Sequence, residues 1–381
     1  MRLLINTSTL KGTGVTQVAV SFINECASIN GNEYIVFLSP IVSQNIDKTK
    51  FPSNFTFYEF GKSSLYGLRG KLDVLKMKLL EAKINPDAVI SVFGPSLWRP
   101  KAPHLQGYAY PHYVYSDLPI FKNMSLMEKI DVKIRQFFHM REMKHDGNYF
   151  VCETEDVSKR LHSLYKIDEK NIFTVSNTAN ATFLNYRQSS REKYDDNIFR
   201  FYSLCSPYPH KNLGVLNSVI PLIKNKTEKE IKFYVTIDNN SYNRLFSEGV
   251  RDSIINIGPL KISECPAFVD SCNALFLPTL LECFSASYPE AMMMEKPILT
   301  SNLPFATTVC KDAALYFDPY NAQDIANKII SLVNDKTLSY KLIKKGKECM
   351  KSFLTPKERA AKYLEICKKI IMNSSGGSGM S

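Results

Sequence analysis

Residues 274–290 read Ala274-Leu275-Phe276-Leu277-Pro278-Thr279-Leu280-Leu281-Glu282-Cys283-Phe284-Ser285-Ala286-Ser287-Tyr288-Pro289-Glu290. The first four residues form an uninterrupted apolar run, which is typical of a strand buried in a parallel sheet. A loop with Glu282 follows, and a helix is predicted to begin near Ser287. Backbone N–H groups at a helix start can hold an anion. Carboxylates such as Glu282 and Glu290 can accept hydrogen bonds from the hydroxyl groups of a ligand.

A purely structural interpretation fits the same stretch. Ser287 would cap the helix, and Glu290, three residues later, would close an ordinary capping box. A capping box stabilises the start of a helix and implies no ligand. The rest of the sequence is needed to choose between a ligand-binding loop and a helix cap.

Outward from this stretch, short apolar runs alternate with segments of helical periodicity, the pattern of parallel α/β proteins. The second half predicts strands at 200–205, 232–237, 254–257, 274–277, 297–300 and 315–317. The first half predicts strands at 3–8, 34–38, 87–92, 104–107, 149–151 and 172–175. We therefore expect two Rossmann-like domains facing a central cleft, with ligands at the carboxyl ends of the strands.

A hydrophilic segment around 185–198 predicts the domain boundary. The expected division is 1–180, 181–355, a helix over 356–372, and a flexible Ser/Gly-rich tail over 373–381. The helix has a clear start, because Thr355 and Glu358 have capping-box spacing and Pro356 stands at the first helical position.

Composition limits the function classes. The chain has 381 residues with 44% hydrophobic and 22% charged residues, which indicates a folded protein. Its net charge of +11 favours anionic partners. Nine cysteines without a Cys-x-x-Cys pair argue against a metal ribbon or a disulfide framework. No signal peptide, membrane-spanning run or nucleic-acid motif is recognisable, so we expect a cytoplasmic protein that binds no nucleic acid.

Two basic segments, 62–84 and 122–145, combine lysines with apolar residues. Such faces can lie on anionic lipid at the inner side of a plasma membrane. A solvated helix face explains the same pattern. Both interpretations remain open at the level of sequence.

From Asn256 to Ile330 the chain resembles the retaining nucleotide-sugar glycosyltransferases of family 4, which have the GT-B fold. The resemblance rests on ordered elements: Gly258, Pro278–Phe284, Pro289–Met292, Lys296–Leu299 and Ala314–Pro319. Upstream, the segment Pro209-His210-Lys211-Asn212-Leu213 resembles the family's His-Lys-Asn segment. The family's final helix crosses back to the first domain, which suits residues 356–372.

The resemblance implies an N-terminal acceptor domain and a C-terminal donor domain. Lys211 and the amides near 284–287 would stabilise the leaving diphosphate, Glu290 would hold the ribose, and Glu282 the sugar. The candidate catalytic residues are Glu282, Lys211 and His112, with His104 as a weaker alternative to His112. The candidate donor-binding residues are Gly14, His210, Lys211, Gly258, Glu282, Phe284, Ser285, Ala286, Ser287 and Glu290.

The implied activity is metal-independent sugar transfer, with retention, from a nucleotide-diphosphate sugar to a glycan or lipid-linked acceptor. Bacterial surface polysaccharide (O-antigen or capsule) is the expected product. No cofactor is expected, and the donor is expected to be a UDP-sugar first and a GDP-sugar second. Two departures from the family pattern matter: no Arg precedes Lys211, and Ser285 replaces a commoner glycine. A catalytically silent nucleotide-sugar-binding subunit and a nucleotide-sugar epimerase are the rival functions.

Overall fold

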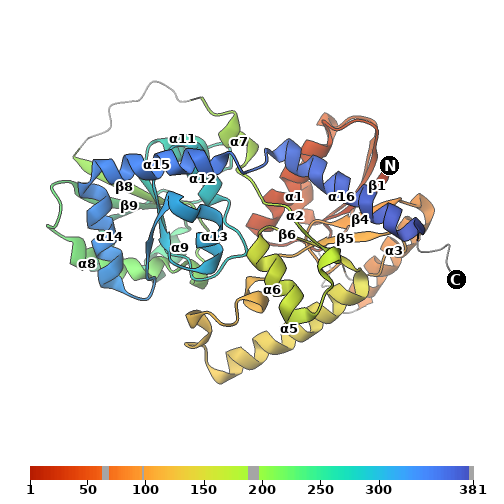
Figure 1. The fold of residues 1–381 in the computed structure, drawn as a ribbon, viewed down its shortest axis with the longest axis horizontal. Coiled ribbons are helices and arrows are strands. Elements are labelled where there is room, and N and C mark those ends of the chain that lie inside the picture. The colour runs from red at the N-terminus through yellow and green to blue at the C-terminus, as the bar shows by residue number, and fades with distance from the viewer. Residues whose placement is uncertain (62–67, 97, 188–196, 377–381) are drawn as a thin grey trace. The chain divides into compact units, whose positions relative to one another are not determined.

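A computed structural model describes residues 1–61, 68–96, 98–187 and 197–376. The chain forms two compact units. Unit 1 comprises Met1–Asn177 and Leu354–Ser381, and unit 2 comprises Thr178–Phe353. Each unit is built on one parallel β-sheet with helices packed on it (Figure 1). The expected α/β class with two Rossmann-like domains is confirmed.

Unit 1 contains a seven-stranded sheet in the order β3-β2-β1-β4-β5-β6-β7, and every neighbouring pair is parallel. Its helices include α1 and α16, which pack against each other on one face of this sheet. The strands are β1 (Arg2–Asn6), β2 (Glu33–Leu38), β3 (Phe55–Glu59), β4 (Ala88–Ser91), β5 (His104–Gly107), β6 (Tyr149–Cys152) and β7 (Ile172–Thr174). The helices are α1 (Thr13–Cys26), α2 (Pro40–Gln44), α3 (Leu68–Ile84), α4 (Pro111–Val114), α5 (Leu126–Asp146), α6 (Glu155–Tyr165) and α16 (Pro356–Gly376).

The two faces of the unit 1 sheet have separate cores, because side chains alternate along each strand. Leu3 and Ile5 pack toward α1 and α16, whose buried residues include Phe22 and Leu364. The intervening Leu4 packs on the other face, with Val89, Trp98 and Met77 of α3. Helix α16, which follows unit 2 in the chain, thus completes the core of unit 1.

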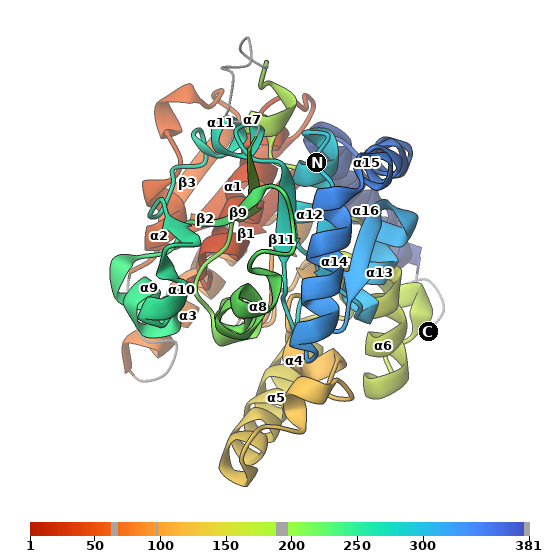
Figure 2. The same ribbon diagram turned by 90° about the vertical axis from the view of Figure 1, so that its left-hand side faces the viewer.

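Unit 2 contains a six-stranded parallel sheet in the order β10-β9-β8-β11-β12-β13. Figure 2 shows α8 and α14 beside each other over this sheet, where Leu216, Ile220 and Ile329 enter the core. The strands are β8 (Ile198–Ser203), β9 (Glu230–Val235), β10 (Ile254–Asn256), β11 (Ala274–Leu277), β12 (Ile298–Ser301) and β13 (Ala314–Phe317). The helices are α7 (Ala181–Leu184), α8 (Leu216–Ile223), α9 (Asn239–Leu245), α10 (Glu248–Arg251), α11 (Cys265–Asp270), α12 (Ser287–Met293), α13 (Pro304–Cys310), α14 (Ala322–Asn334) and α15 (Lys336–Met350).

The start of α16 follows the predicted chemistry. The Thr355 hydroxyl accepts from Glu358 N at 3.3 Å, and the Glu358 carboxylate accepts from Thr355 N at 2.8 Å. Its end differs from the prediction, because the helix continues to Gly376 rather than ending at residue 372. The first residues of the expected tail are therefore helical, and 377–381 lie outside the described residues.

No helix within the described ranges is both long enough and apolar enough to cross a bilayer.

Candidate active site

The centre of the unit 2 sheet is a topological switch point. From β8 the chain moves outward through β9 to β10, whereas β11, on the other side of β8, leads to β12 and β13. Loops that leave adjacent strands in opposite directions open a crevice at their carboxyl ends, which is where open α/β sheets bind ligands. Lys211 follows β8 and Glu282 follows β11, so both nominated residues lie at this point.

The two loops at the switch point are held together by one carbonyl. His210 O accepts a hydrogen bond from Leu280 N at 2.7 Å, and the Thr279 hydroxyl lies 3.2 Å from the same oxygen. The Thr279 hydroxyl is also 2.9 Å from the Glu282 carboxylate. The predicted segments 209–213 and 278–284 therefore contact each other, and His210 contributes its backbone to this contact.

Lys211 and Glu282 form an ion pair in this crevice. Their side chains are only 14% and 12% exposed, respectively. Burial opposes the charged form of Lys211, but Glu282, together with Cys205 and Tyr208, outweighs this effect, and the pKa of Lys211 lies above its ordinary value. Lys211 thus carries a full positive charge in a largely dry position, where a charge acts strongly on a ligand.

The loop before α12 presents backbone donors. Among the described residues, no backbone hydrogen bond starts from the N–H groups of Phe284, Ser285, Ala286 or Ser287. The helix begins at Ser287 with Ala286 at the capping position and no side-chain cap. The capping-box interpretation of Ser287 and Glu290 is therefore wrong, because Ser287 is already helical and Glu290 lies one position too far along. The N–H groups are available to an anion.

Glu290 is buried in the first turn of α12, with 7% of its surface exposed. Asn180 N lies 3.5 Å from its carboxylate. Burial raises the pKa of Glu290 to about 8, and the Asn180 amide lowers it only in part. A buried carboxyl group with a single distant donor is suited to accept further hydrogen bonds from a ligand that brings hydroxyl groups.

Gly258 and the His210 ring lie at the edge of this arrangement. Gly258 follows β10 with a φ of +81°, which a residue with a side chain rarely adopts. The His210 ring stacks on Tyr208, with ring centroids 5.6 Å apart and an interplanar angle of 11°. Tyr208, which the sequence analysis did not nominate, is 50% exposed and offers a flat apolar surface beside Lys211.

Two candidates lie in unit 1. Gly14 is the second residue of α1, just after β1, and a Cβ added to it would meet nothing within 4 Å. His112 lies in α4, after the carboxyl end of β5, with its ring edge-on to Phe121. Burial, together with the charge of Arg135, lowers the pKa of His112. His112 is therefore predominantly neutral at physiological pH.

The alternative, His104, is wrong for a ligand site. It is the first residue of β5 and so lies at the amino end of the strand. Its ring nitrogens contact Ser91 Oγ and Asp146 O, each at 2.9 Å. Burial lowers the pKa of His104 to about 4, which keeps the ring neutral. These features define a structural histidine.

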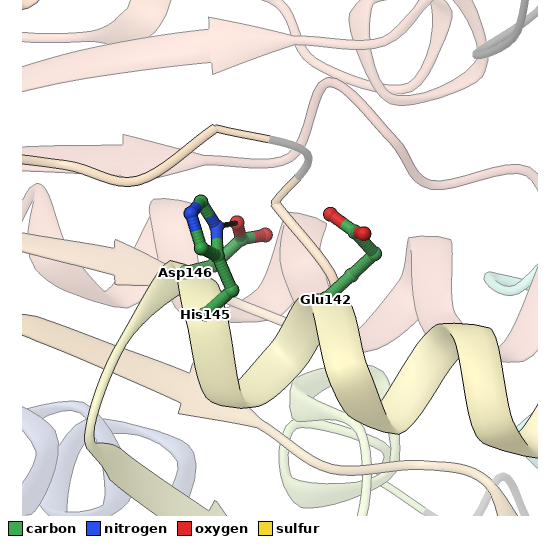
Figure 3. A group of neighbouring side chains, drawn as sticks. All are labelled: Glu142, His145 and Asp146. Carbon is green, nitrogen blue, oxygen red and sulfur yellow. Dashed lines mark hydrogen bonds and ion pairs between the residues drawn. The ribbon is translucent and has the colours of Figure 1, made fainter.

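A separate group in α5 has metal-ligand residue types (Figure 3). The ligand atoms of Glu142, His145 and Asp146 lie within 4.8 Å of one another. The Asp146 carboxylate, however, accepts a hydrogen bond from Ser96 at 2.9 Å and lies 3.3 Å from the His145 ring. Asp146 thus holds the end of α5 in place, and the group supports no metal proposal.

Residues 183–349 match the family model described as Glycosyl transferases group 1. The matched residues lie in unit 2 and include both residues of the ion pair at the switch point.

A curated relative is the uncharacterized glycosyltransferase MJ1178 of Methanocaldococcus jannaschii, 23% identical over 236 residues. This match spans 60% of the chain and 61% of the relative.

Solved structures show the same GT-B fold over nearly the whole chain. WaaG, a glycosyltransferase involved in lipopolysaccharide biosynthesis, has a TM-score of 0.74 at 10% identity, covering 96% of this chain and 99% of that one. Anabaena Alr3699/HepE, solved in complex with UDP and glucose, has a TM-score of 0.67 at 11% identity, covering 97% and 100%. Both GT-B sheets expected from the sequence are thus present.

Proposed function

We propose that this chain is a retaining glycosyltransferase of the family 4 type, which moves a sugar from a nucleotide-diphosphate donor to a hydroxyl group of an acceptor. The observation that carries the proposal is the buried Lys211–Glu282 pair at the switch point of the group 1 domain. A lysine at this position suits a diphosphate, and a carboxylate beside it suits sugar hydroxyls.

In the proposed mechanism, donor binding exchanges the partners of this pair. Lys211 turns from Glu282 to the diphosphate and stabilises the negative charge that grows as the sugar leaves. Glu282 is then free to accept hydrogen bonds from the sugar. The amides of 284–287 hold a phosphate oxygen, and Glu290 accepts from the ribose. Gly258 and His210 are further candidates for residues that line the donor site.

Proton transfer in this scheme needs no dedicated base. The acceptor hydroxyl attacks the anomeric carbon from the face that the diphosphate leaves, and a leaving phosphate oxygen takes the hydroxyl proton. Lys211 and the loop amides supply the positive potential that a metal ion supplies elsewhere. We therefore propose that the sugar transfer uses neither a metal ion nor a cofactor.

We assign acceptor binding to unit 1. His112 would lie near the transferred sugar, and Gly14 would leave room for the acceptor or the donor phosphate. A glycan or lipid-linked acceptor in bacterial surface-polysaccharide synthesis, at the cytoplasmic side of the membrane, is the proposed setting. The likeness to WaaG, a glycosyltransferase involved in lipopolysaccharide biosynthesis, supports this setting through the fold alone.

A catalytically silent nucleotide-sugar-binding subunit is the second candidate. The segment Cys205–Lys211 lacks an Arg that would share the diphosphate charge. Such a subunit would bind the donor without turnover. An epimerase would instead release an epimerised free nucleotide sugar, so product analysis separates all three functions.

Thermal unfolding with UDP, GDP, ADP, CMP and their sugar conjugates, with and without Mg²⁺, tests the proposal. Ligands that bind the native state raise the melting temperature by mass action. We expect stabilisation by one class of nucleotide diphosphate, equal in both metal conditions, with UDP first and GDP second. No stabilisation by any nucleotide would overturn the site, and strictly Mg²⁺-dependent stabilisation would overturn the metal-independent mechanism.

A further inference from the structure

Helices α3 and α5 lie on the same face of the unit 1 sheet. Met77 of α3 packs with Val89 of β4, and the Gln106 side chain of β5 donates to Met143 O of α5 at 2.8 Å. Val89 and Ser91 are the register partners of His104 and Gln106, so these side chains share one face. Opposite this face, α1 and α16 cover the other core.

One loop joins the ends of the two helices. Trp98 Nε1 donates to Glu81 of α3 at 3.0 Å, and Ser96 donates to Asp146 of α5 at 2.9 Å. Both acceptor carboxylates are buried. The outward sides of α3 and α5 therefore lie on the same side of the unit 1 sheet, and the same loop contacts both helices.

The outward side of α5 is apolar. At about 100° per residue, its large exposed side chains fall on one side of the helix, roughly opposite the buried Met143. These side chains are 43–75% exposed and comprise Leu126, Met127, Ile130, Ile134, Phe137 and Phe138. A surface helix ordinarily has one apolar stripe, toward the core. The second stripe of α5 is turned away from this core.

The outward side of α3 repeats this arrangement independently. Leu72, Leu75 and Leu79 recur at helical spacing and are 53–64% exposed. They lie roughly opposite Met77, which is buried in the core under the helix. Two helices of different sequence thus expose apolar stripes on the same face of the sheet.

Positive charge borders both stripes. On α3, the exposed Lys71 and Lys78 lie on one side of the leucines, and Lys76 and Lys83 on the other. On α5, Arg141 lies in the stripe and Lys133 borders it on one side. Asp131, which pairs with Arg135, lies at the other border, and Glu128 is turned away from the stripe. Long basic side chains can rest on an apolar phase while their charged ends reach anionic groups. The apolar ridges and the flanking charge complement a negatively charged lipid surface.

We propose that this surface of unit 1, formed by the outward sides of α3 and α5, docks on an anionic phospholipid bilayer. The leucines and phenylalanines enter the headgroup region, and the lysines contact lipid phosphates. Docking does not depend on the proposed sugar transfer, because it requires neither donor nor turnover. Residues 62–67 of the basic segment expected from the sequence lie outside the described residues.

Co-sedimentation of the full chain with vesicles tests the proposal. Phosphatidylcholine vesicles are compared with vesicles that also contain phosphatidylglycerol. We expect binding to the anionic vesicles that falls with added salt. The double variant Ile134→Ser/Phe137→Ser should bind at least tenfold more weakly, because it removes two large apolar side chains from the interface. Lys71→Gln/Lys78→Gln should lose roughly fivefold for each charge.

The matched controls lie on α16, over the opposite face of the same sheet. Met372 is 72% exposed and Lys368 is exposed, so Met372→Ser and Lys368→Gln change similar chemistry elsewhere. Both controls should bind vesicles like the wild type, and all variants should keep the wild-type melting temperature and nucleotide binding. Failure to bind anionic vesicles, or equal loss in the α16 controls, would overturn the proposal. So would a dimer in sedimentation analysis that the α5 variant dissociates, because the surface would then bind a second copy.

Discussion

The two sheets share a topology but differ in what they place at their switch points. In unit 2, the loops after β8 and β11 bring together the charged pair Lys211 and Glu282. In unit 1, the corresponding adjacent strands β1 and β4 end in Asn6 and Ser91, whose side chains hydrogen-bond at 3.1 Å.

The unit 1 network continues to His104, and it is neutral throughout because burial holds the pKa of that ring at about 4. Of the two switch points, the one in unit 2 thus carries the charged pair. The shared topology places a crevice at the switch point of each sheet. The residues at the strand ends then decide which crevice can hold an anion. Mutations can test this assignment of the anion site to unit 2.

Lys211→Ala should have the largest effect. Loss of the cation should reduce sugar transfer by about 10²–10³-fold and weaken UDP binding in calorimetry. The control is Ser91→Ala at the unit 1 switch point, which should cost about 1 kcal/mol of stability and leave UDP affinity unchanged. If Ser91→Ala weakens UDP binding more than Lys211→Ala does, the assignment of the anion site to unit 2 is reversed.

Glu282→Gln should separate transfer from nucleotide binding. The neutral amide keeps the shape but weakens the hydrogen bonds to the sugar, so turnover should fall by roughly 10–100-fold. Affinity for UDP should be unchanged or higher, because Lys211 no longer has a competing carboxylate. Glu295→Gln, which removes an exposed pair with Lys347, is the control and should change neither quantity. Equal loss of UDP binding and turnover would contradict the proposed role of Glu282.

Glu290 should make stability and binding depend on pH. Its pKa is raised from 4.5 to about 8. The folded state therefore binds more protons than the unfolded state between these values, and the free energy of unfolding should fall as pH rises through this window. Glu290→Gln should remove up to roughly 1.4 kcal/mol of that fall per pH unit. Urea unfolding of both proteins across the window measures the difference.

The same group should release a proton when UDP binds near neutral pH, because a ribose hydrogen bond favours the carboxylate. Calorimetry in buffers of different ionisation enthalpy detects this release. A wild type that releases no proton, together with a Glu290→Gln variant of unchanged UDP affinity, would show that Glu290 does not contact the ribose.

Thr355→Ala should have the smallest effect and should leave unit 2 untouched. It removes one half of the capping box of α16 and should lower the free energy of unfolding by about 1 kcal/mol. UDP affinity should stay at the wild-type value, since α16 belongs to unit 1. A change in UDP affinity larger than the change in stability would contradict the separation of the two roles.

Sequence reasoning predicted the elements whose signal is local. The apolar run 274–277 coincides with β11, and the cap at Thr355 is present as expected. It missed β3 (Phe55–Glu59), an edge strand in which only Phe55 is buried, because half-exposed edge strands lack a continuous apolar run.

The contacts of the candidate site were less predictable. Lys211 and Glu282 are separated by 71 positions in the sequence, and only the adjacency of β8 and β11 brings them together. Asn180 reaches Glu290 through a backbone N–H, which every residue except proline carries, so no residue type signals it. Thr279 was quoted within the motif but not nominated, although its hydroxyl ties Glu282 to the neighbouring loop.

The return of α16 to unit 1 also orders events during synthesis. Ala360, Leu364, Cys367 and Ile370 are buried in a core that begins with Leu3 and Ile5. Domains generally fold as the ribosome releases them, but this one lacks a helix until all of unit 2 has been translated. On the ribosome, unit 2 can therefore finish folding first, while one apolar face of unit 1 is covered only in part, by α1. The N-terminal half of the chain is the later half to mature.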